Sequence, residues 1–311
     1  MGTESIWVAG ASGMVGGAVV RQLRSQGLEA FAPTRKELDL SNRSLVIEWC
    51  KDNRPAVAVV CAAKVGGILA HEMDPVGFLD ENLRIQSNVL AACHHAMVSR
   101  VVFMGSSCIY PKYAEQPISE EQLLTGRLEP TNEGYAIAKI AGIRLVQAYR
   151  EQYGYDWVSL MPTNLYGPGD NYDDRSSHVL AALLKKIHWA KIRKDSFITL
   201  WGDGSPLREF MHCDDLANAV IHILDAYHEP EHLNIGSGQE ISVENLARLI
   251  MKVVGVELDL RFDETKPNGT PRKLLDSSRL NALGWRARLD LEHGISLTYQ
   301  QLLDTEHPAF V

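Results

Sequence analysis

The 311-residue sequence has few cysteines, no long apolar run and a minority of basic side chains. Its cysteines form no CxxC pair and are odd in number, which argues against disulfides or a metal site and favours a reducing, cytoplasmic location; they are Cys50, Cys61, Cys93, Cys108 and Cys213. No run reaches the roughly 18 apolar residues of a membrane span, and the first residues lack a signal-peptide pattern. The formal net charge of −8 argues against nucleic-acid or membrane partners.

Short apolar runs alternate with helical periods over the first 160 or so residues. Ala56–Cys61, for example, is apolar at every position, as expected of a strand covered on both faces. Strands are expected over 5–9, 28–32, 56–62, 100–105 and 157–161, and helices over 14–26, 43–53, 82–97 and 135–153. This alternation predicts an α/β fold with a Rossmann-type, doubly wound parallel sheet.

The rhythm changes after Pro162. A Gly/Pro/Asp/Asn-rich loop at 166–174 precedes an expected helix over 177–194, a strand over 198–201 and a helix ending near 227. A late strand over 233–236 and a helix over 242–254, capped by Ser242, follow. We therefore predict an NADP-binding domain over residues 1–165, to which the chain returns around 208–235, and a smaller α/β substrate domain formed mainly by 166–311.

A glycine-rich turn follows the first expected strand and opens the first helix. Its glycines allow a sharp turn and a close approach of the backbone to a pyrophosphate at the helix N-terminus. The segment comprises Gly10, Ser12, Gly13, Met14, Val15 and Gly16, and its GxxGxxG spacing is typical of short-chain dehydrogenases/reductases.

The second strand ends without the acidic residue that would hold a ribose hydroxyl of NAD. Arg35 stands there instead, and a guanidinium suits the 2′-phosphate of NADP, although a solvated basic turn is the alternative. Asp39 and Leu40 are placed to reach adenine, or Asp39 caps the next helix.

Tyr135 and Lys139 lie four residues apart on one face of an expected helix. We expect the ammonium to favour the phenolate and so to lower the pKa of Tyr135, which would let it exchange protons near neutral pH. Ser106 follows Gly105 at the end of the fourth strand, where strand ends line the ligand crevice, and its hydroxyl can polarise a carbonyl.

Longer motifs extend this pattern over nearly the whole chain, and through them the sequence resembles the GDP-L-fucose synthases. They are Gly105–Pro111, Glu129–Asn132, Tyr135–Gly142, Met161–Pro168, Trp201–Gly202, Arg208–His212 and Gly269–Asp276. The resemblance implies epimerisation of GDP-4-keto-6-deoxy-D-mannose at C3 and C5, NADPH-dependent reduction at C4, and a homodimer through the helices at 82–97 and 135–153.

The resemblance also implies roles for single residues. Cys108 and His178 become the base and acid of epimerisation, and His178 stands at an expected helix start whose dipole would lower its pKa. Together with Gly105, Lys139 and His178, the segment of Pro162, Asn164 and Leu165 flanks the cofactor. Contacts with GDP are implied for Lys186, Trp201, Arg208 and Asp276; the alternatives are a solvated helix charge for Lys186, a core position for Trp201, and surface ion pairs for the other two.

Other readings stay open. A 4-epimerase or 4,6-dehydratase shares the scaffold, but Ser107 and Cys108 stand where a dehydratase has an Asp-Glu pair. A colitose- or 6-deoxyheptose-type synthase applies the same chemistry to a related GDP-keto-sugar, and a non-catalytic NADP sensor is the third alternative. Ser12 stands where the family often has arginine, so Arg35 alone would select NADP.

Overall fold

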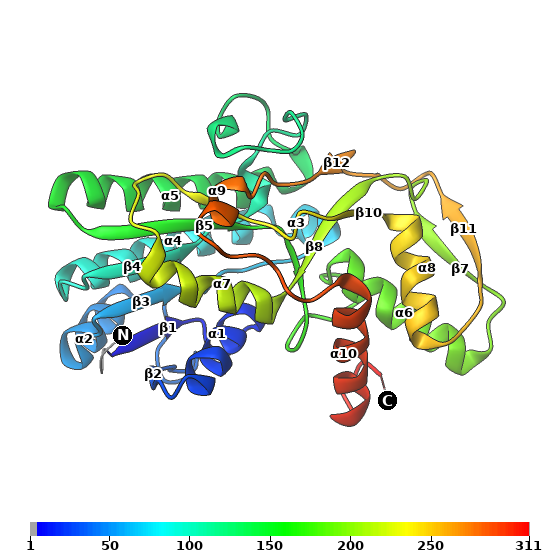
Figure 1. Cartoon of the computed structure of the whole chain (residues 1–311), viewed down its shortest axis with the longest axis horizontal. Coiled ribbons are helices and arrows are strands. Elements are labelled where there is room, and N and C mark those ends of the chain that lie inside the picture. Colours follow the sequence, from blue (N-terminus) through cyan, green and yellow to red (C-terminus); the bar gives the residue numbers. More distant parts are fainter. Residues whose placement is uncertain (1–4, 311) are drawn as a thin grey trace.

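A six-stranded parallel sheet forms the larger half of the molecule (Figure 1), in a computed structural model that describes residues 5–310. Its strand order is β2-β1-β3-β4-β5-β9. The strands are β1 (Ile6–Ala9), β2 (Ala30–Phe31), β3 (Val57–Val60), β4 (Arg100–Met104), β5 (Asp156–Pro162) and β9 (Leu233–Ile235). The arrangement confirms the predicted Rossmann-type α/β fold.

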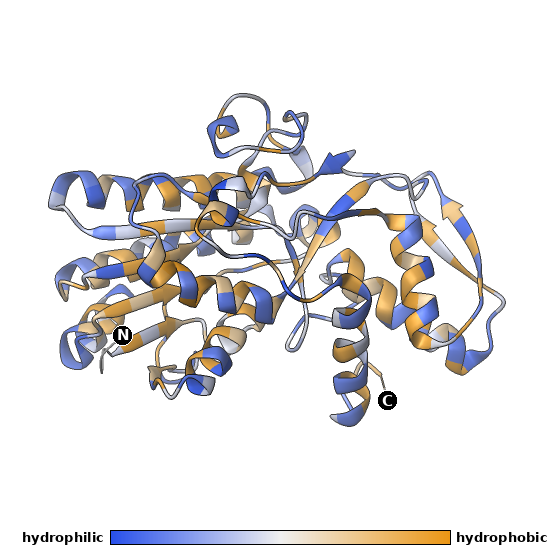
Figure 2. Ribbon diagram, in the orientation of Figure 1, coloured by the Kyte–Doolittle hydropathy of each residue, from blue (hydrophilic) through white to orange (hydrophobic). Residues whose placement is uncertain are grey.

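Helices cover both faces of this sheet. One face packs against α1 (Met14–Ser25) and α7 (Cys213–Ala226) through side chains such as Val19 and Val220. The other face packs against α2 (Arg43–Asn53), α4 (Pro75–His95) and α5 (Glu133–Tyr153), with Leu90 and Ile143 in its core. Because both faces are covered, the strands are mostly apolar, as Figure 2 shows.

A second layer of structure lies beyond the carboxyl ends of these strands. Its small sheet joins β6 (Asn164–Tyr166), β8 (Leu207–His212), β10 (Glu240–Ser242) and β12 (Arg272–Lys273), and β7 (Phe197–Trp201) pairs with β11 (Asp259–Asp263). A third core beneath them includes Leu184 and Ile250 and involves α6 (Val179–Arg193), α8 (Val243–Val254) and α10 (Leu291–Asp304). The short α9 (Ser278–Ala282) instead contacts β9 of the large sheet.

Two helices, α4 and α3 (Ile68–Met73), differ from the sequence-based expectation. The helix expected from residue 82 begins at Pro75, because Asp74 accepts a hydrogen bond from the Gly77 amide and proline fits the first helical turn. The short α3 was not predicted. Ser242 does cap α8, as expected. None of the helices within residues 5–310 is long and apolar enough to cross a membrane.

Candidate active site

The glycine-rich turn after β1 leads into α1, and its glycines leave the backbone there without side chains that would cover it. Gly10 has φ +89°, and a Cβ there would lie 2.6 Å from the Ala62 amide nitrogen. A Cβ on Gly16 would overlap the Gly10 carbonyl oxygen. Gly13 begins α1 without a side-chain cap, and Ser12 and Gly13 are exposed. This turn therefore fits the diphosphate of a dinucleotide, which needs exposed amides at a helix N-terminus.

The segment after β2 places two exposed cations, Arg35 and Lys36, near the expected position of an adenosine ribose. The Arg35 side chain is 78% exposed, and its nearest carboxylate, Glu81 on α4, is 3.6 Å away. The Asp39 carboxylate accepts hydrogen bonds from the Ser41 amide and hydroxyl, which lowers its pKa. Asn42, not Asp39, caps α2. Asp39 is thus a turn residue, and Leu40 beside it packs at the edge of the core.

Ser106 and Cys108 lie just beyond β4, at the edge of the large sheet that faces the second layer. The Gly105 amide donates to the Leu160 carbonyl, which extends the pairing with β5 by one residue. The Ser106 hydroxyl then accepts from the Cys108 amide at 3.2 Å and starts a short 3-10 turn. This local bond fixes the two side chains relative to each other.

Tyr135 and Lys139 are buried on α5, with 8% and 2% of their surfaces exposed. Lys139 Nζ donates to the Met104 carbonyl at 2.7 Å and lies 5.9 Å from the centre of the Tyr135 ring. Burial lowers the pKa of Lys139 to about 8. Burial also raises the pKa of Tyr135, with a smaller contribution from Cys108, while the Ser106 hydroxyl opposes the rise. The expectation that Lys139 lowers the pKa of this phenol is therefore wrong here, because desolvation dominates.

The Cys108 sulfur accepts hydrogen bonds from two distant segments. Asn132 Nδ2 is 3.3 Å away and Lys273 Nζ is 3.4 Å away. Burial disfavours the thiolate, but the Lys273 ammonium and the Ser106 hydroxyl outweigh it, so the pKa of Cys108 is lowered. The sequence analysis missed both donors, although each belongs to a motif that it noted. Residue type alone did not show that they face this sulfur.

His178 precedes α6 and comes to the site on a segment that also contacts α3. The Gly67 amide donates to the Ser176 carbonyl at 2.9 Å, two residues before His178. Desolvation lowers the pKa of His178, and the Lys273 ammonium lowers it further. The direction matches the prediction, but the causes are burial and a cation, and no helix dipole is needed.

His71 on α3 is a buried histidine that sequence reasoning missed. Its ring centre is 3.9 Å from that of Phe78 and 5.6 Å from that of Tyr135. Burial lowers its pKa to about 4, and a neighbouring His178 adds to the effect. His71 is therefore an uncharged side chain that packs beside Tyr135 at the site.

Three of the four predicted nucleotide-binding residues lie on or next to β7 and β8. They are Lys186, Trp201 and Arg208. Lys186 Nζ donates to the Thr199 carbonyl on β7, and Trp201 at the end of that strand is 46% exposed, so it is not a core residue. Asn268 links the turn after Trp201 to Arg208: its side chain accepts from the Asp203 amide, and its carbonyl accepts from the Arg208 guanidinium. Neither Arg208 nor Lys186 is in an ion pair among the described residues.

Asp276 stands apart from this group. Its carboxylate accepts from the Ser278 amide in the turn before α9, and its own amide donates to the Ile118 carbonyl. The residue beside Arg208 is instead Asn268, which the sequence analysis did not single out. The signal that could have found it is its position next to the glycine of the Gly269–Asp276 motif.

The Pro162–Leu165 segment joins the two layers. It runs from the end of β5 into β6, and Asn164 Nδ2 donates to the Glu209 carbonyl on β8 at 2.7 Å. The Glu209 carboxylate is itself fully buried and accepts from the Gly238 and Leu275 amides. These bonds set the second layer against the carboxyl ends of β4 and β5.

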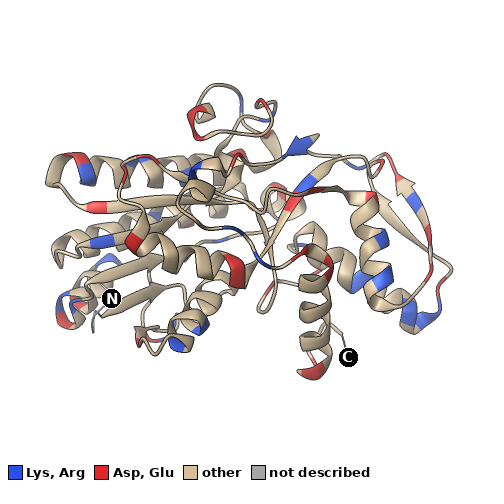
Figure 3. Cartoon of the chain, viewed as in Figure 1, with Lys and Arg blue, Asp and Glu red and all other residues tan. Residues whose placement is uncertain are grey.

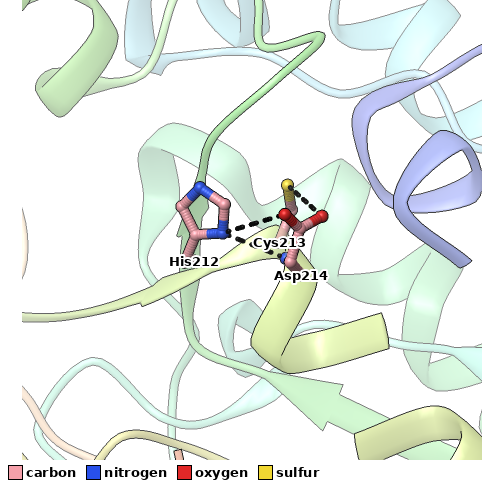
Figure 4. Close-up of side chains that lie close together, drawn as sticks. All are labelled: His212, Cys213 and Asp214. Atoms are coloured by element: carbon pink, nitrogen blue, oxygen red, sulfur yellow. Dashed lines mark hydrogen bonds and ion pairs between the residues drawn. The ribbon is translucent and has the colours of Figure 1, made fainter. Parts of the chain in front are cut away.

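His212, Cys213 and Asp214 form a compact cluster at the start of α7 (Figure 4), and its donor types could hold a metal ion. His212 Nδ1 accepts from the Asp214 amide, which caps the helix. The Asp214 carboxylate pairs with Arg21 on α1 at 2.7 Å. Burial raises the pKa of Cys213 to about 12. Helix capping and the α1–α7 ion pair account for this cluster.

A sequence profile of the NAD dependent epimerase/dehydratase family matches residues 6–236. The chain therefore belongs to that family. Within it, the chain is 50% identical over 300 residues to a GDP-L-fucose synthase of Sinorhizobium fredii, with 96% of each chain covered. It is 52% identical over 302 residues to GDP-L-fucose synthase 1 of Arabidopsis thaliana, covering 97% of this chain and 94% of that protein.

More distant relatives include proteins that are named for other GDP-sugars. GDP-L-colitose synthase of Yersinia pseudotuberculosis is 36% identical over 304 residues, with 97% of this chain and 99% of that protein covered. A GDP-6-OMe-4-keto-L-xylo-heptose reductase from C. jejuni superposes with a TM-score of 0.91 at 32% identity, covering 98% and 99% of the two chains. A GDP-L-fucose synthetase from Naegleria fowleri bound to NADP gives 0.89 at 25% identity, covering 99% and 96%.

Proposed function

We propose that this protein converts GDP-4-keto-6-deoxy-D-mannose to GDP-L-fucose by inverting C3 and C5 and then reducing C4. The observation that carries the proposal is the second acid–base pair. Besides Ser106, Tyr135 and Lys139, which a simple ketoreductase needs, the site contains Cys108 with a lowered pKa and, on the opposing segment, His178. The relatives at 50% identity and above support the same chemistry.

NADPH is the cofactor that this site would take, and when bound it supplies the hydride for C4. The bare turn from Gly10 to Gly16 would hold its diphosphate. Arg35 pairs with Glu81 at 3.6 Å but is 78% exposed, so its guanidinium is accessible to the 2′-phosphate. The carboxyl ends of β4 and β5, with Gly105, Pro162, Asn164 and Leu165, would face its nicotinamide end.

Epimerisation follows from the acidity of protons next to a ketone. The C4 carbonyl stabilises an enolate when a base removes a proton from C3 or C5. The Cys108 thiolate takes the proton and becomes a thiol, while the C–H electron pair moves into the enolate. His178 takes up a proton from solvent and returns it to the opposite face of the same carbon, which inverts that carbon. The Cys108 thiol then releases its proton to solvent, and His178 takes up another, before the second carbon reacts.

Reduction uses the groups at the end of β4 and on α5. Ser106 donates a hydrogen bond to the C4 oxygen, and Tyr135 gives that oxygen its proton as the hydride reaches the carbon. The high pKa of Tyr135 keeps the phenol protonated at neutral pH, so it is ready to act as the acid. Lys139, whose own pKa is lowered, can then restore the proton.

The nucleotide end of the substrate would lie along β7 and β8. Lys186 and Arg208 offer positive charge to the diphosphate, and Trp201 offers an exposed aromatic face. Asp276 stays a prediction, and Asn268 is the polar group beside Arg208. The relative that makes GDP-L-colitose supports one alternative, the same chemistry on a related GDP-keto-sugar.

We further propose two domains, a homodimer and a cytoplasmic location. The NADP-binding domain would comprise residues 1–165 with the returning α7 and β9, and the rest of 166–311 would be mainly the substrate domain. Exposed apolar side chains on α4 and α5 support dimerisation through these helices; they include Val76, Ile137 and Tyr153. Free thiols at all five cysteines support a reducing compartment.

The test is product identification. Purified protein is incubated with NADPH and GDP-4-keto-6-deoxy-D-mannose, and the sugar is assigned by NMR. GDP-L-fucose is the expected product. Faster turnover of the keto-sugar precursor of GDP-L-colitose would favour that alternative, and NADPH binding without turnover of either would point to a sensor.

A further inference from the structure

The Cys108 sulfur accepts hydrogen bonds from two side chains and donates none within residues 5–310. The donors are Asn132 Nδ2 at 3.3 Å and Lys273 Nζ at 3.4 Å. A thiol is a weak hydrogen-bond acceptor, whereas a thiolate is the form that an ammonium and an amide N–H stabilise. The arrangement therefore fits the ionised sulfur.

Lys273 is held in this position by its backbone. It lies on β12, opposite Arg208 of β8. On either side of it, the Arg272 carbonyl accepts from the Gln116 side chain and the Leu274 amide donates to the same side chain. The backbone that carries Lys273 is thus held from two sides before any ligand binds, which limits the entropy lost when the side chain reaches the sulfur. Figure 3 shows β12 as a short, wholly basic strand above the sheet.

The surroundings leave this ammonium free to act on the sulfur. Lys273 has no carboxylate partner within residues 5–310, and the Glu129 carboxylate is paired with Lys112 at 3.0 Å. Ser106 faces Cys108 from β4, and the Arg208 cation faces it from β8. Tyr135 faces it from α5 and is uncharged at neutral pH. Lys273 and Arg208 therefore face the sulfur as cations, and the one acid that lines the same cavity within residues 5–310, Glu129, is ion-paired with Lys112.

We infer that Lys273 is a positioning residue that keeps Cys108 as a thiolate in the resting enzyme, with Asn132 as the second donor. Resting on the proposed function, this assigns the base of epimerisation before substrate arrives. The same ammonium adds to the effect of burial on His178, which is therefore neutral at rest and takes up a proton before it acts as the acid.

The test is the pH profile of Cys108 alkylation by iodoacetamide in the free enzyme. The alkylated peptide is quantified by mass spectrometry, and the thiolate is followed in parallel by its ultraviolet absorbance. Cys108→Ala gives the background from the other thiols, which are largely buried. In the wild type we expect the midpoint of the profile to lie below ~8.5, the usual pKa of a cysteine thiol.

Lys273→Met removes the charge and keeps much of the length. We expect its midpoint to rise by at least about one unit, which lowers the thiolate fraction at neutral pH about tenfold. Lys273→Arg should restore most of the shift, and Asn132→Asp, which puts a carboxylate at the sulfur, should raise the midpoint. Lys266→Met, an exposed lysine on the preceding segment, is the matched control and should leave the midpoint unchanged.

An unchanged midpoint in Lys273→Met, with NADPH binding retained as evidence of folding, would overturn the inference. So would a wild-type midpoint at the ordinary thiol value. Because the titration needs no sugar nucleotide, it can succeed while turnover of every GDP-keto-sugar fails. That combination would reject the proposed function and leave the Lys273–Cys108 pair in place.

Discussion

Lys139 is an ionisable side chain buried at the active site. We therefore expect the free energy of unfolding to depend on pH through this residue. Burial lowers its pKa in the folded protein from 10.5 to about 8. Between these two values the unfolded chain holds a proton that the folded chain has lost. Stability therefore rises with pH in this window, at ~1.4 kcal/mol for each unit.

Lys139→Met keeps much of the packing and removes the titration. The unfolding free energy of the wild type minus that of the variant should increase by about 2 kcal/mol between about pH 7 and about pH 9.5, because ~1.5 units of the window are crossed. Cysteines and tyrosines of the unfolded chain also begin to ionise in this range, but they are common to both proteins, so their contribution to the difference is small. Urea unfolding at the two pH values measures it.

The control is Lys51→Met on α2, an exposed lysine. The difference in unfolding free energy between this variant and the wild type should be the same at both pH values. If the difference for Lys139→Met is also the same at both pH values, the Lys139 ammonium remains hydrated in the folded protein. Its burial then cannot explain proton transfer to Tyr135.

Three further changes test the cofactor site and the reduction step. Arg35→Ala should raise the KM for NADPH about tenfold to a hundredfold, the value of a charge-assisted contact of ~1.5–3 kcal/mol, and leave that for NADH unchanged; an equal effect in Lys36→Ala would contradict a specific role. Tyr135→Phe should slow NADPH oxidation by ~10²–10⁴ while exchange at C3 and C5 continues, and near-normal oxidation would remove Tyr135 from the mechanism. Gly16→Ala should destabilise the fold by ~1–3 kcal/mol through its overlap with Gly10, whereas Gly17→Ala, with an ordinary contact of 3.5 Å, should be tolerated; equal unfolding midpoints would contradict the close approach.

Much of the fold could be predicted because its signals are local. The strands of the large sheet are short apolar runs and its helices have a clear period, so α2 matches its predicted bounds at both ends. The start of α4 could not be placed from periodicity, since Asp74 and Pro75 begin it a turn and more before the apolar pattern becomes regular. The narrow β2 is also shorter than its apolar run, because only Ala30 and Phe31 pair with β1.

Only those parts of the site whose positions follow from the order of strands and helices along the chain could be predicted. The positions of Ser106 and Tyr135 follow from where strand and helix end, which sequence shows. The contact of Lys273 with Cys108 joins segments 165 residues apart, and no local pattern encodes it. The direction of the Tyr135 pKa shift could not be predicted either, because it depends on how deeply the phenol is buried and not on its spacing from Lys139.

The central claim is that one site both inverts two carbons and reduces a third, and deuterium incorporation tests it most directly. Turnover in D₂O by the wild type should give GDP-L-fucose with deuterium at C3 and C5. In Cys108→Ala the base is missing while Ser106, Tyr135 and Lys139 remain, so the recovered sugar should carry far less deuterium at both carbons, and any reduced product should be a 6-deoxy-D-hexose. Wild-type exchange in Cys108→Ala would contradict the account, because the base would then lie elsewhere.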